Sequence, residues 1–520
     1  GAKAGDLVHC QLQRHPFADG KPSVKVRQSF GPIGTPGLEN DYCAARAGIE
    51  KMLPKDKFKA IEALVGDGAN ADETREDLRA LPLVSIDSPN TFDIDDALCA
   101  EPQDEGWLLT VAIADPTTCI KEVAELTTLI ATRGTSHYFH GLAIPMLPEA
   151  LSQSAALRPQ EDKNALVCRL TISADGDITD SSIKLAVVQS KAKLSYQEVE
   201  EVLTDSAEHE FAERLHHLND CFSALRAWRE SRELVIEHRP EHRWLLNENK
   251  QIDRIEEVQK KGSQLLVEEC MVAANRCIAQ ALKDAELPGP FVTHAGIRRD
   301  RAEEAKEFLT RFLPEQNAID FSTLDGFRTL INELNAASDE RPLRSMINRL
   351  MSRASFSVKP APHMGMALPV YTNGTSPLRK ALDFCVHLQL KAMLGDTNVK
   401  TAPATVFDLI NQASAKNRQA VRAANNWLSC NFLNAQNAHG QSDYDAEIVH
   451  INTSGFTVKL KDLGLEGTVD LRREEEKFSF DKWEMALASK TRRYQLRQQI
   501  RVKYQPVEKP RGESASFTAI

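Results

Sequence analysis

The sequence predicts a multidomain α/β or α+β protein that ends in a small all-β barrel. Its 520 residues, 42% of them hydrophobic, are enough for about three or four domains with sizeable cores. From Leu81 to about Gly440, apolar runs typical of strands alternate with helical periodicity. The next stretch, of about 70 residues, instead carries several short strands separated by Asn, Ser and Gly turns, which is typical of an OB-type barrel.

The N-terminal part is predicted to contain two short strands, a connector and a helical stretch. Residues 5–30 read as two strands around a turn that contains Asp19 and Gly20, too little to bury a core alone. The connector GPIGTPGLEN then leads into a mostly helical stretch from about Asp41 to Asp77.

Composition excludes several classes. The cysteines form no CxxC pair, so neither a zinc site nor a disulfide framework is indicated, and a reducing cytoplasm fits best. Without an apolar leader or a run of roughly 20 apolar residues, we expect neither secretion nor membrane insertion. The net charge of −10 hides a basic run from Lys490 to Arg511, which is either a solvated end or a polyanion-binding stripe.

The segment IDSPNTFDIDDAL carries the main functional signal. Asp87, Asp93, Asp95 and Asp96 lie between the apolar runs LPLVSI and WLLTVAIA, so they should cluster where two buried strands end. They could be turn and cap residues. A calcium loop is excluded, because counting from Asp93 puts Leu98 at the position of the turn glycine. A magnesium site, with carboxylate ligands and open positions for water and phosphate, explains the clustered charge best.

The segment YTNGTSPLRKALDFCVH suggests a phosphate contact. We expect Ser376 or Thr375 to cap a helix, which would place Arg379 near its N-terminus, where a phosphate is favoured. A capped helix with a merely solvated Arg379 is the alternative. Asp383 and His387, four residues apart, are expected to orient neighbouring groups rather than to bind metal.

Together these segments resemble the ribonuclease II/R family of exoribonucleases, which carry the RNB catalytic domain. IDSPNTFDIDDAL is similar to the family's aspartate signature, and VAIADPT, HGLAIPMLP, KAKLSY, VEECMVAAN and TSPLRKALDFCVH follow in family order. The resemblance implies an α/β (α+β) RNB domain with flanking all-β OB-fold domains, the N-terminal one partial. The implied parts are a cold-shock-like OB domain at 1–30, a largely helical linker at 31–80, the RNB domain at 81–440, an S1 RNA-binding OB domain at 441–508 and a flexible tail at 509–520.

The resemblance also implies an activity and its residues. The expected reaction is magnesium-dependent hydrolysis of single-stranded RNA from the 3′ end to 5′-mononucleotides by a two-metal-type mechanism, with Mn²⁺ as a possible substitute. The implied metal ligands are Asp87, Asp93, Asp95 and Asp96, and Arg379 completes the catalytic set. The implied RNA-binding residues are Tyr138, Tyr196, Glu268, Ser376 and Arg379. We expect a monomer whose partner is single-stranded RNA, with no membrane association.

The sequence departs from the family pattern at several positions. Ile236 stands where relatives can carry a base-stacking Phe, Asn373 and Gly374 replace an aromatic residue before TSP, and Val421 stands where an acid can occur. These departures keep a second hypothesis open, an RNA-binding regulator of the same fold with weak or lost catalysis. A magnesium-dependent nucleotidyltransferase ranks below both, because no Gly-rich loop or basic triphosphate cradle is found.

Overall fold

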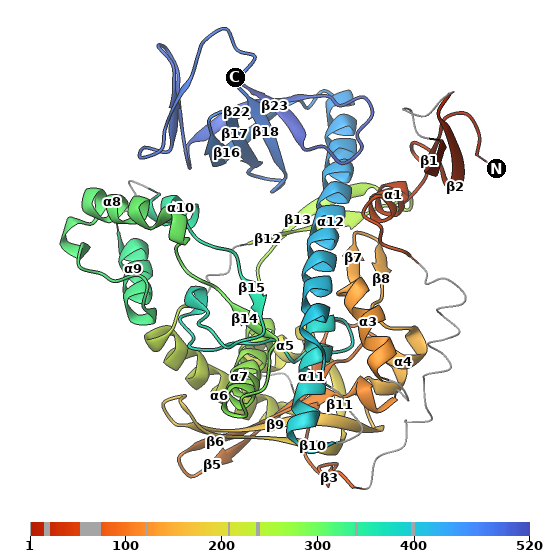
Figure 1. Cartoon of the computed structure of the whole chain (residues 1–520), viewed down its shortest axis with the longest axis vertical. Helices are drawn as coiled ribbons and strands as arrows, with labels where there is room; N and C mark the ends of the chain where they lie inside the picture. Colours follow the sequence, from red (N-terminus) through yellow and green to blue (C-terminus); the bar gives the residue numbers. More distant parts are fainter. Residues whose placement is uncertain are drawn as a thin grey trace.

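The computed structural model describes residues 2–14, 21–51, 74–119, 123–205, 208–235, 240–337, 342–396 and 401–520. A broad β-sheet with helices on both faces forms one end of the molecule, and a closed β-barrel forms the other (Figure 1). One long helix, α12 (Ala404–Ala438), runs from the first region to the second. No helix among the described residues is both long and apolar enough to cross a membrane.

The large sheet has seven strands in the order β11-β4-β5-β6-β9-β10-β3. In that order they span Ala192–Ser195, Val84–Asp87, Asp96–Gln103, Gly106–Ala114, Asp162–Ser173, Ile178–Gln189 and Glu76–Asp77. Strands β4, β5, β6, β9 and β10 pair antiparallel with their neighbours, whereas β11 and β3 join the edges in parallel. The sheet is therefore mixed, in agreement with the predicted α/β (α+β) class.

Strand β6 shows why helices cover both faces of this sheet. Its sequence GWLLTVAIA is apolar almost throughout, and its last six residues are buried. Val111 and Ile113 enter one core while Ala112 and Ala114 enter the other, as the two-residue period of a strand requires. A continuous apolar run is typical of a strand that is buried on both faces.

Each core is closed by its own set of helices. The core that contains Val111 lies against α5 (Tyr196–Asp205), α6 (Ala212–Arg232) and α7 (Gly262–Asp284). The opposite core lies against the start of α12 and three further helices, α3 (Val123–Arg133), α4 (Glu149–Ala155) and α11 (Ala381–Met393). At its other end α12 meets the barrel, where the Tyr504 hydroxyl donates to Asn434 Oδ1 over 3.1 Å.

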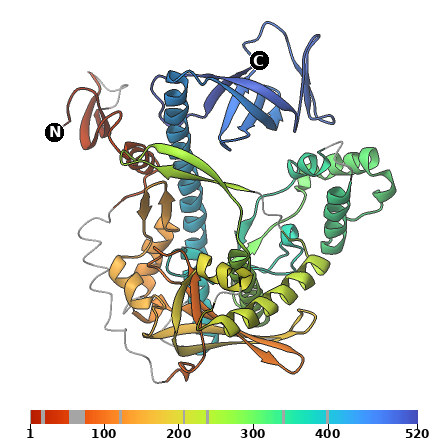
Figure 2. The same ribbon diagram turned by 180° about the vertical axis from the view of Figure 1, so that it is seen from behind.

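Three segments pack around the middle of α12 (Figure 2). They are α1 (Leu38–Arg46), the hairpin of β7 (His137–Phe139) and β8 (Leu142–Ile144), and the hairpin of β12 (Glu241–Leu246) and β13 (Ile252–Val258). Glu39 Oε1 accepts hydrogen bonds from Gln251 Nε2 over 2.9 Å and from Asn431 Nδ2 over 2.8 Å. One buried carboxylate oxygen thus links α1, the second hairpin and α12.

The closed barrel has the strand order β16-β17-β18-β23-β22. In that order the strands span Asp443–Asn452, Gly455–Leu460, Glu466–Asp470, Ala515–Ala519 and Gln499–Gln505. A separate three-stranded sheet consists of β19 (Ser479–Asp481), β20 (Ala486–Ala488) and β21 (Arg493–Gln495). The prediction of a flexible tail at 509–520 is wrong, because β23 pairs with β18 and β22 and its Phe517 is buried in the barrel core.

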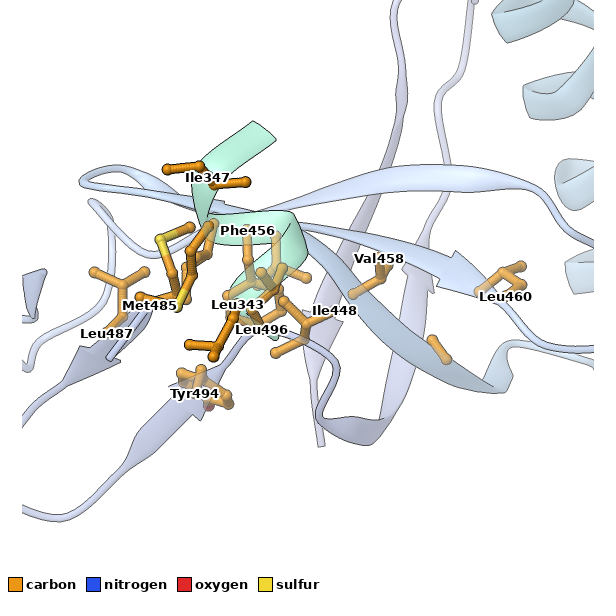
Figure 3. Packing of buried hydrophobic residues seen from close by; sticks show 14 of the residues in the cluster. Leu343, Ile347, Ile448, Phe456, Val458, Leu460, Met485, Leu487, Tyr494 and Leu496 are labelled. Atoms are coloured by element: carbon orange, nitrogen blue, oxygen red, sulfur yellow. The ribbon is translucent and has the colours of Figure 1, made fainter. Parts of the chain in front are cut away.

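A helical subdomain supports the barrel from another side. It consists of α8 (Ala302–Phe312), α9 (Leu324–Ala336) and α10 (Leu343–Asn348), next to the strand pair β14 (Phe291–Thr293) and β15 (Ser355–Ser357). Figure 3 shows Leu343 of α10 among Ile448, Phe456 and Leu496 of the barrel region. The described residues also include short 3-10 segments at Pro116–Cys119, Arg299–Arg301, Pro314–Gln316 and Met364–Met366.

The two predicted N-terminal strands are confirmed as an antiparallel hairpin, β1 (Asp6–Arg14) and β2 (Ser23–Pro32). The expected turn at Asp19 and Gly20 lies outside the described residues, as do residues 52–73 of the expected helical linker at 31–80. The described parts of that linker contain helix α1 and the short strand β3. The hairpin lies beside α1, away from the closed barrel (Figures 1 and 2).

Candidate active site

The four predicted aspartates lie at one edge of the large sheet. Asp87 is the last residue of β4 and Asp96 is the first residue of β5, and these two strands are antiparallel neighbours. The short connection between them carries Asp93 and Asp95. Strand pairing therefore brings the four side chains together, as the sequence predicts.

The connection between β4 and β5 is held by local hydrogen bonds. Asp87 Oδ1 accepts from the Ser88 backbone N–H over 2.7 Å and from the Thr91 hydroxyl over 2.9 Å. Lys193 of β11 donates its Nζ to the carbonyl oxygens of Pro89 (2.9 Å) and Thr91 (2.7 Å). Asp87 thus also has the turn-forming role that was one of the alternatives for this segment.

Asp95 joins this loop to a segment far away in the chain. Its Oδ2 accepts from Arg379 Nε over 2.7 Å, and its Oδ1 accepts from the Leu378 backbone N–H over 2.9 Å. Asp95 is buried, whereas the Arg379 side chain remains 39% exposed. The guanidinium is therefore anchored on one side and open to a further anion on the other.

Arg379 lies in a turn that is fastened from several directions. Its Nη2 donates to Ser376 Oγ over 3.0 Å, and its backbone carbonyl accepts from the Thr135 hydroxyl and the Ser136 N–H, each over 2.8 Å. The predicted helix start is wrong: α11 begins at Ala381, because Lys380 is extended and forms a bridge with Thr135. Ser376 therefore holds the guanidinium instead of capping the helix.

Two buried residues of α11 hold this turn in place. Asp383 Oδ2 accepts the Ser376 N–H over 2.9 Å, and His387 Nε2 lies 2.8 Å from the Gly374 carbonyl oxygen. Both side chains are fully buried. Asp383 and His387 therefore orient the Arg379 turn, as their spacing suggested. Gly374 itself has little space, because an added Cβ would lie 3.0 Å from Ile278 and 3.1 Å from Val386.

The carboxylates carry more negative charge than Arg379 balances. Burial and the charges of Asp95 and Asp87 raise the pKa of Asp96 to about 8. Burial raises the pKa of Asp95 to about 7, although Arg379 and the Leu378 N–H oppose this shift. A second cation among these groups would restore their ordinary ionisation.

The donor set fits a magnesium ion in an open site. Mg²⁺ prefers oxygen ligands and uses one or two carboxylates together with water and substrate phosphate. Among the described residues, no three His, Cys, Asp or Glu side chains are grouped closely enough to hold a metal. Because Arg379 already binds Asp95, Asp87 and Asp96 are the carboxylates best able to take up the ion, with the other positions left to water and substrate.

The predicted aromatic residues flank the cluster, whereas Glu268 has another partner. Tyr138 is half-exposed on β7 and donates its hydroxyl to Asp93 Oδ2 over 3.2 Å. Burial, together with the charges of Asp87 and Asp96, raises the pKa of Tyr196 to about 12, so Tyr196 lies near these two carboxylates. Glu268 is exposed on α7 and pairs with Lys260 over 2.8 Å. Ile236 lies outside the described residues.

A cavity of about 950 Å³ extends from Arg379 and Tyr138 between α12, β12 and the barrel. Its cationic wall residues are Arg379, Lys380, Arg418, Arg422 and Lys459. Its acidic wall residues are Glu241 and Glu466. The sequence analysis missed Arg418 and Arg422, although their four-residue spacing places both on one face of a helix. The barrel thus meets the aspartate site through a wall with excess positive charge.

The basic run from Lys490 to Arg511 is not the basic part of this wall. Arg492 pairs with Glu474 (2.9 Å) and Glu476 (3.4 Å), and Arg501 lies 3.8 Å from Asp445. The barrel instead contributes Lys459, with the hydroxyl side chains of Thr457 and Thr468. Much of the run's charge is therefore balanced within the barrel region.

A second buried acid, Asp115, lies close to the site and was not singled out from the sequence. Asp115 Oδ2 lies 2.8 Å from Arg75 Nη2 and 3.4 Å from Lys391 Nζ, and all three side chains are buried. Burial alone would raise the pKa of Asp115, but Lys391 and Arg75 lower it well below its ordinary range. Lys391 Nζ also lies 3.3 Å from Asp396 Oδ2, so each charge of this cluster has a partner of opposite sign.

Comparisons with known proteins agree with this geometry. The family model of the RNB domain matches residues 75–396. Exoribonuclease 2 of Yersinia enterocolitica is 34% identical over 471 residues, which cover 89% of this chain and 72% of the relative. Exoribonuclease 2 of Pectobacterium atrosepticum is 34% identical over 469 residues, 88% of this chain and 71% of the relative.

Solved structures share the fold at lower identity. Mycoplasma genitalium RNase R in complex with ribose-methylated single-stranded RNA has a TM-score of 0.85 at 20% identity, covering 99% of this chain and 83% of that one. Yeast Ssd1, described as a pseudonuclease, has a TM-score of 0.68 at 17% identity, covering 94% of this chain and 62% of that one. The fold alone is thus compatible with an active or an inactive site.

Proposed function

The chain belongs to the RNB-domain exoribonucleases of the ribonuclease II/R family, and from this premise we propose that it hydrolyses single-stranded RNA from the 3′ end to 5′-mononucleotides. In this proposal magnesium, or manganese in its place, is held among Asp87, Asp93, Asp95 and Asp96, and the reaction is a two-metal-type phosphodiester hydrolysis. The observation that carries it is the basic cavity that connects the barrel to the Arg379 and Asp95 pair.

In this proposal some residues bind the RNA strand and others act at the scissile bond. Arg418, Arg422 and Lys459 contact the phosphate backbone as the strand passes through the cavity, a contact that is independent of sequence. Tyr138 and Tyr196 stack on bases near the 3′ end, which is worth roughly 1–3 kcal/mol per base. Arg379, held by Asp95 and Ser376, binds the phosphate at the scissile bond.

The carboxylates would hold the metal next to the 3′ end of the RNA. Bound metal ions would activate a water and neutralise charge on the phosphodiester. Glu268 contacts the RNA sugar, a contact of the kind that separates RNA from DNA. Because α11 fixes the Arg379 turn through Asp383 and His387, the guanidinium reaches the phosphate without rearranging.

We also propose that the protein works as a monomer in the cytoplasm and needs no membrane. The support is the set of free cysteines, most of them buried, without a disulfide among the described residues.

A second candidate is an RNA-binding regulator with this fold but little catalysis. The crowded Gly374 favours it, because the position before TSP leaves no room for the aromatic side chain of the family pattern without a shift of Ile278 or Val386. Against it, all four carboxylates and Arg379 are present, Arg379 binds Asp95, and the charges of Asp95 and Asp87 act on Asp96.

The test is a time course with 5′-labelled single-stranded RNA, with magnesium or with chelator, resolved to single nucleotides. The exoribonuclease predicts a metal-dependent ladder or a short limit product together with released 5′-mononucleotides. Asp104→Asn, at the exposed far end of β5, serves as a matched control that should keep full activity. Intact RNA despite demonstrated binding would overturn the catalytic proposal in favour of the regulator.

A further inference from the structure

Phe92, directly before Asp93, is 74% exposed, more than any other large hydrophobic side chain in the described part of the chain. Burying a Phe side chain is worth about 1.5–3 kcal/mol, so this exposure has a cost. It does not come from a loose loop, because Lys193 binds the carbonyls of Pro89 and Thr91, and Thr91 binds Asp87. The loop therefore presents the ring to solvent in a defined place.

Phe92 forms one wall of a pocket of about 220 Å³. Tyr138 of β7 and Ala143 of β8 form another wall, and they are direct cross-strand partners, so both side chains leave the hairpin on the same face. The neighbours of Tyr138 on β7, His137 and Phe139, are buried on the opposite face. The pocket is thus built from a turn and a hairpin that are both fixed by hydrogen bonds.

The pocket is separate from the large cavity: the cavity reaches Arg379, whereas the pocket reaches Asp93. Ser136 and Tyr138 line both spaces, so the Tyr138 side chain stands between them. Asp93 and Leu378 also line the small pocket, and the Leu378 N–H is the group that donates to Asp95. A molecule in the pocket would therefore lie within one nucleotide's reach of the carboxylates and Arg379.

The lining indicates a planar aromatic ligand with polar edges. The pocket is smaller than the roughly 300–1,000 Å³ of sites for drug-sized ligands, so it suits one ring system and not a chain of nucleotides. Two aromatic side chains offer stacking surfaces, while Ser152 and Gln153 of α4 offer polar atoms at the margin. Gln153 Nε2 already donates to Glu149 over 2.7 Å, which orients its amide.

We propose that this pocket holds the base of the released nucleoside 5′-monophosphate, with Phe92 and Tyr138 on either side and the phosphate directed to the aspartate site. The inference rests on the proposed function for the identity of the product. In this arrangement the cavity holds the RNA strand, and the pocket beyond Tyr138 retains the cleaved nucleotide. Phe92 is thus a product-binding residue, and product release depends on it.

The experiment measures binding and needs no turnover. AMP, adenosine and ribose 5-phosphate are titrated, in the presence of magnesium, into the protein and its variants, and dissociation constants are obtained by ligand-observed NMR. Phe92→Ala should weaken the binding of AMP and of adenosine by the same factor, roughly 5- to 150-fold if one stacking contact of about 1–3 kcal/mol is lost. Ribose 5-phosphate, which has no base, should bind both proteins alike.

Two further variants complete the test. Ala143→Leu should also weaken AMP, because it fills the pocket from the hairpin side, whereas Leu394→Ala, at the partly exposed end of α11, should not. AMP that does not bind, or that binds Phe92→Ala and Ala143→Leu as tightly as the unaltered protein, would overturn the inference. If the unaltered protein does not hydrolyse RNA, that result counts against the proposed function. The binding result is independent of it, because the binding experiment needs no turnover.

Discussion

The acids at two neighbouring strand ends, Asp115 at one and Asp95 with Asp96 at the other, have opposite surroundings. The Ala114 N–H donates to the Asp95 carbonyl, so Asp115, the next residue, lies one strand away from Asp95 and Asp96. Asp115 contacts two cations, one of which also pairs with Asp396, and the pKa of Asp115 is lowered. Asp95 and Asp96 share one guanidinium with two further carboxylates, and their pKa values are raised. Buried charge that is fully paired supports the fold, whereas buried charge short of a cation marks a site.

The largest effect is expected from Asp95→Asn. This change removes the charge that anchors Arg379 and weakens the carboxylate set, while the amide can still accept from the Leu378 N–H. Losing one electrostatic stabiliser of a transition state costs about 10²–10³ in rate, and we expect at least the upper end here. RNA hydrolysis rates and urea unfolding curves check this: activity should vanish while the free energy of unfolding changes little. An active Asp95→Asn would contradict the assigned role.

Asp115→Asn should give the reverse result. It removes the carboxylate that Arg75 and Lys391 share, although Lys391 keeps Asp396 at 3.3 Å, and breaking a buried pair typically costs about 3–5 kcal/mol. Urea denaturation measures the loss, and Asp77→Asn, which breaks an exposed pair with Arg79, is the control with little effect. If both variants are equally stable, the Asp115 cluster does not support the fold as argued.

Stability should depend on pH with opposite signs at the two places. In chelator, folded Asp96 binds its proton up to a pKa of about 8, whereas unfolded Asp releases it near 3.8. The folded state then binds more protons between these values, so the free energy of unfolding falls as pH rises from about 4 to 8. Asp115, with a lowered pKa, contributes stability above its unfolded value that is lost as pH falls below about 4.

Urea unfolding at a series of pH values tests this pair of signs. Asp96→Asn should reduce the decline between pH 4 and 8 to the part that Asp95 causes, which ends near pH 7, and added magnesium should reduce the decline in the unaltered protein by supplying the missing cation. Asp115→Asn should instead remove the part of the loss of unfolding free energy below about pH 4 that Asp115 causes. A decline toward pH 8 that survives in Asp96→Asn would show that another group causes it.

The smallest effects come from two hydroxyl donors. Tyr138→Phe removes the hydrogen bond to Asp93, and Thr117→Val removes the one to Asp115 Oδ1. A hydrogen bond contributes about 0.5–1.5 kcal/mol, and somewhat more to a charged group. We expect Tyr138→Phe to slow RNA hydrolysis several-fold without loss of stability, and Thr117→Val to lower stability without slowing hydrolysis per folded molecule. If Tyr138→Phe lowered stability and Thr117→Val slowed hydrolysis, the aspartate site and the Asp115 cluster would not differ in role as argued.

Much of the site could be predicted because its signals are local. The aspartates lie at the ends of two strands that the apolar runs LPLVSI and WLLTVAIA already indicate, and adjacent strands bring their ends together. The predicted class and barrel follow from the same periodicities. The pairing of Asp95 with Arg379 could not be predicted from spacing, because 284 residues separate them and only tertiary packing joins them.

The errors and omissions have the same origin. Ser376 has the sequence of a helix cap, but the bridge between Lys380 and Thr135 delays the helix to Ala381. Asp115 and Lys391 are single charges in apolar surroundings, and nothing local marks them as partners. Phe92 is an ordinary apolar residue in the sequence, and only its exposure beside a pocket gives it meaning.

The position of β23 near the C-terminus determines when the barrel can close during synthesis of the chain. A barrel that closes through Ala515–Ala519 cannot form until the ribosome has made residues that follow β18 by more than forty positions, and distant pairings of this kind form slowly. Domains made earlier fold first, so the sheet with its aspartates can be complete while β18 and β22 still have open edges. A nascent chain can therefore form the aspartate site before Lys459 and Thr468 complete the wall of the cavity beside it.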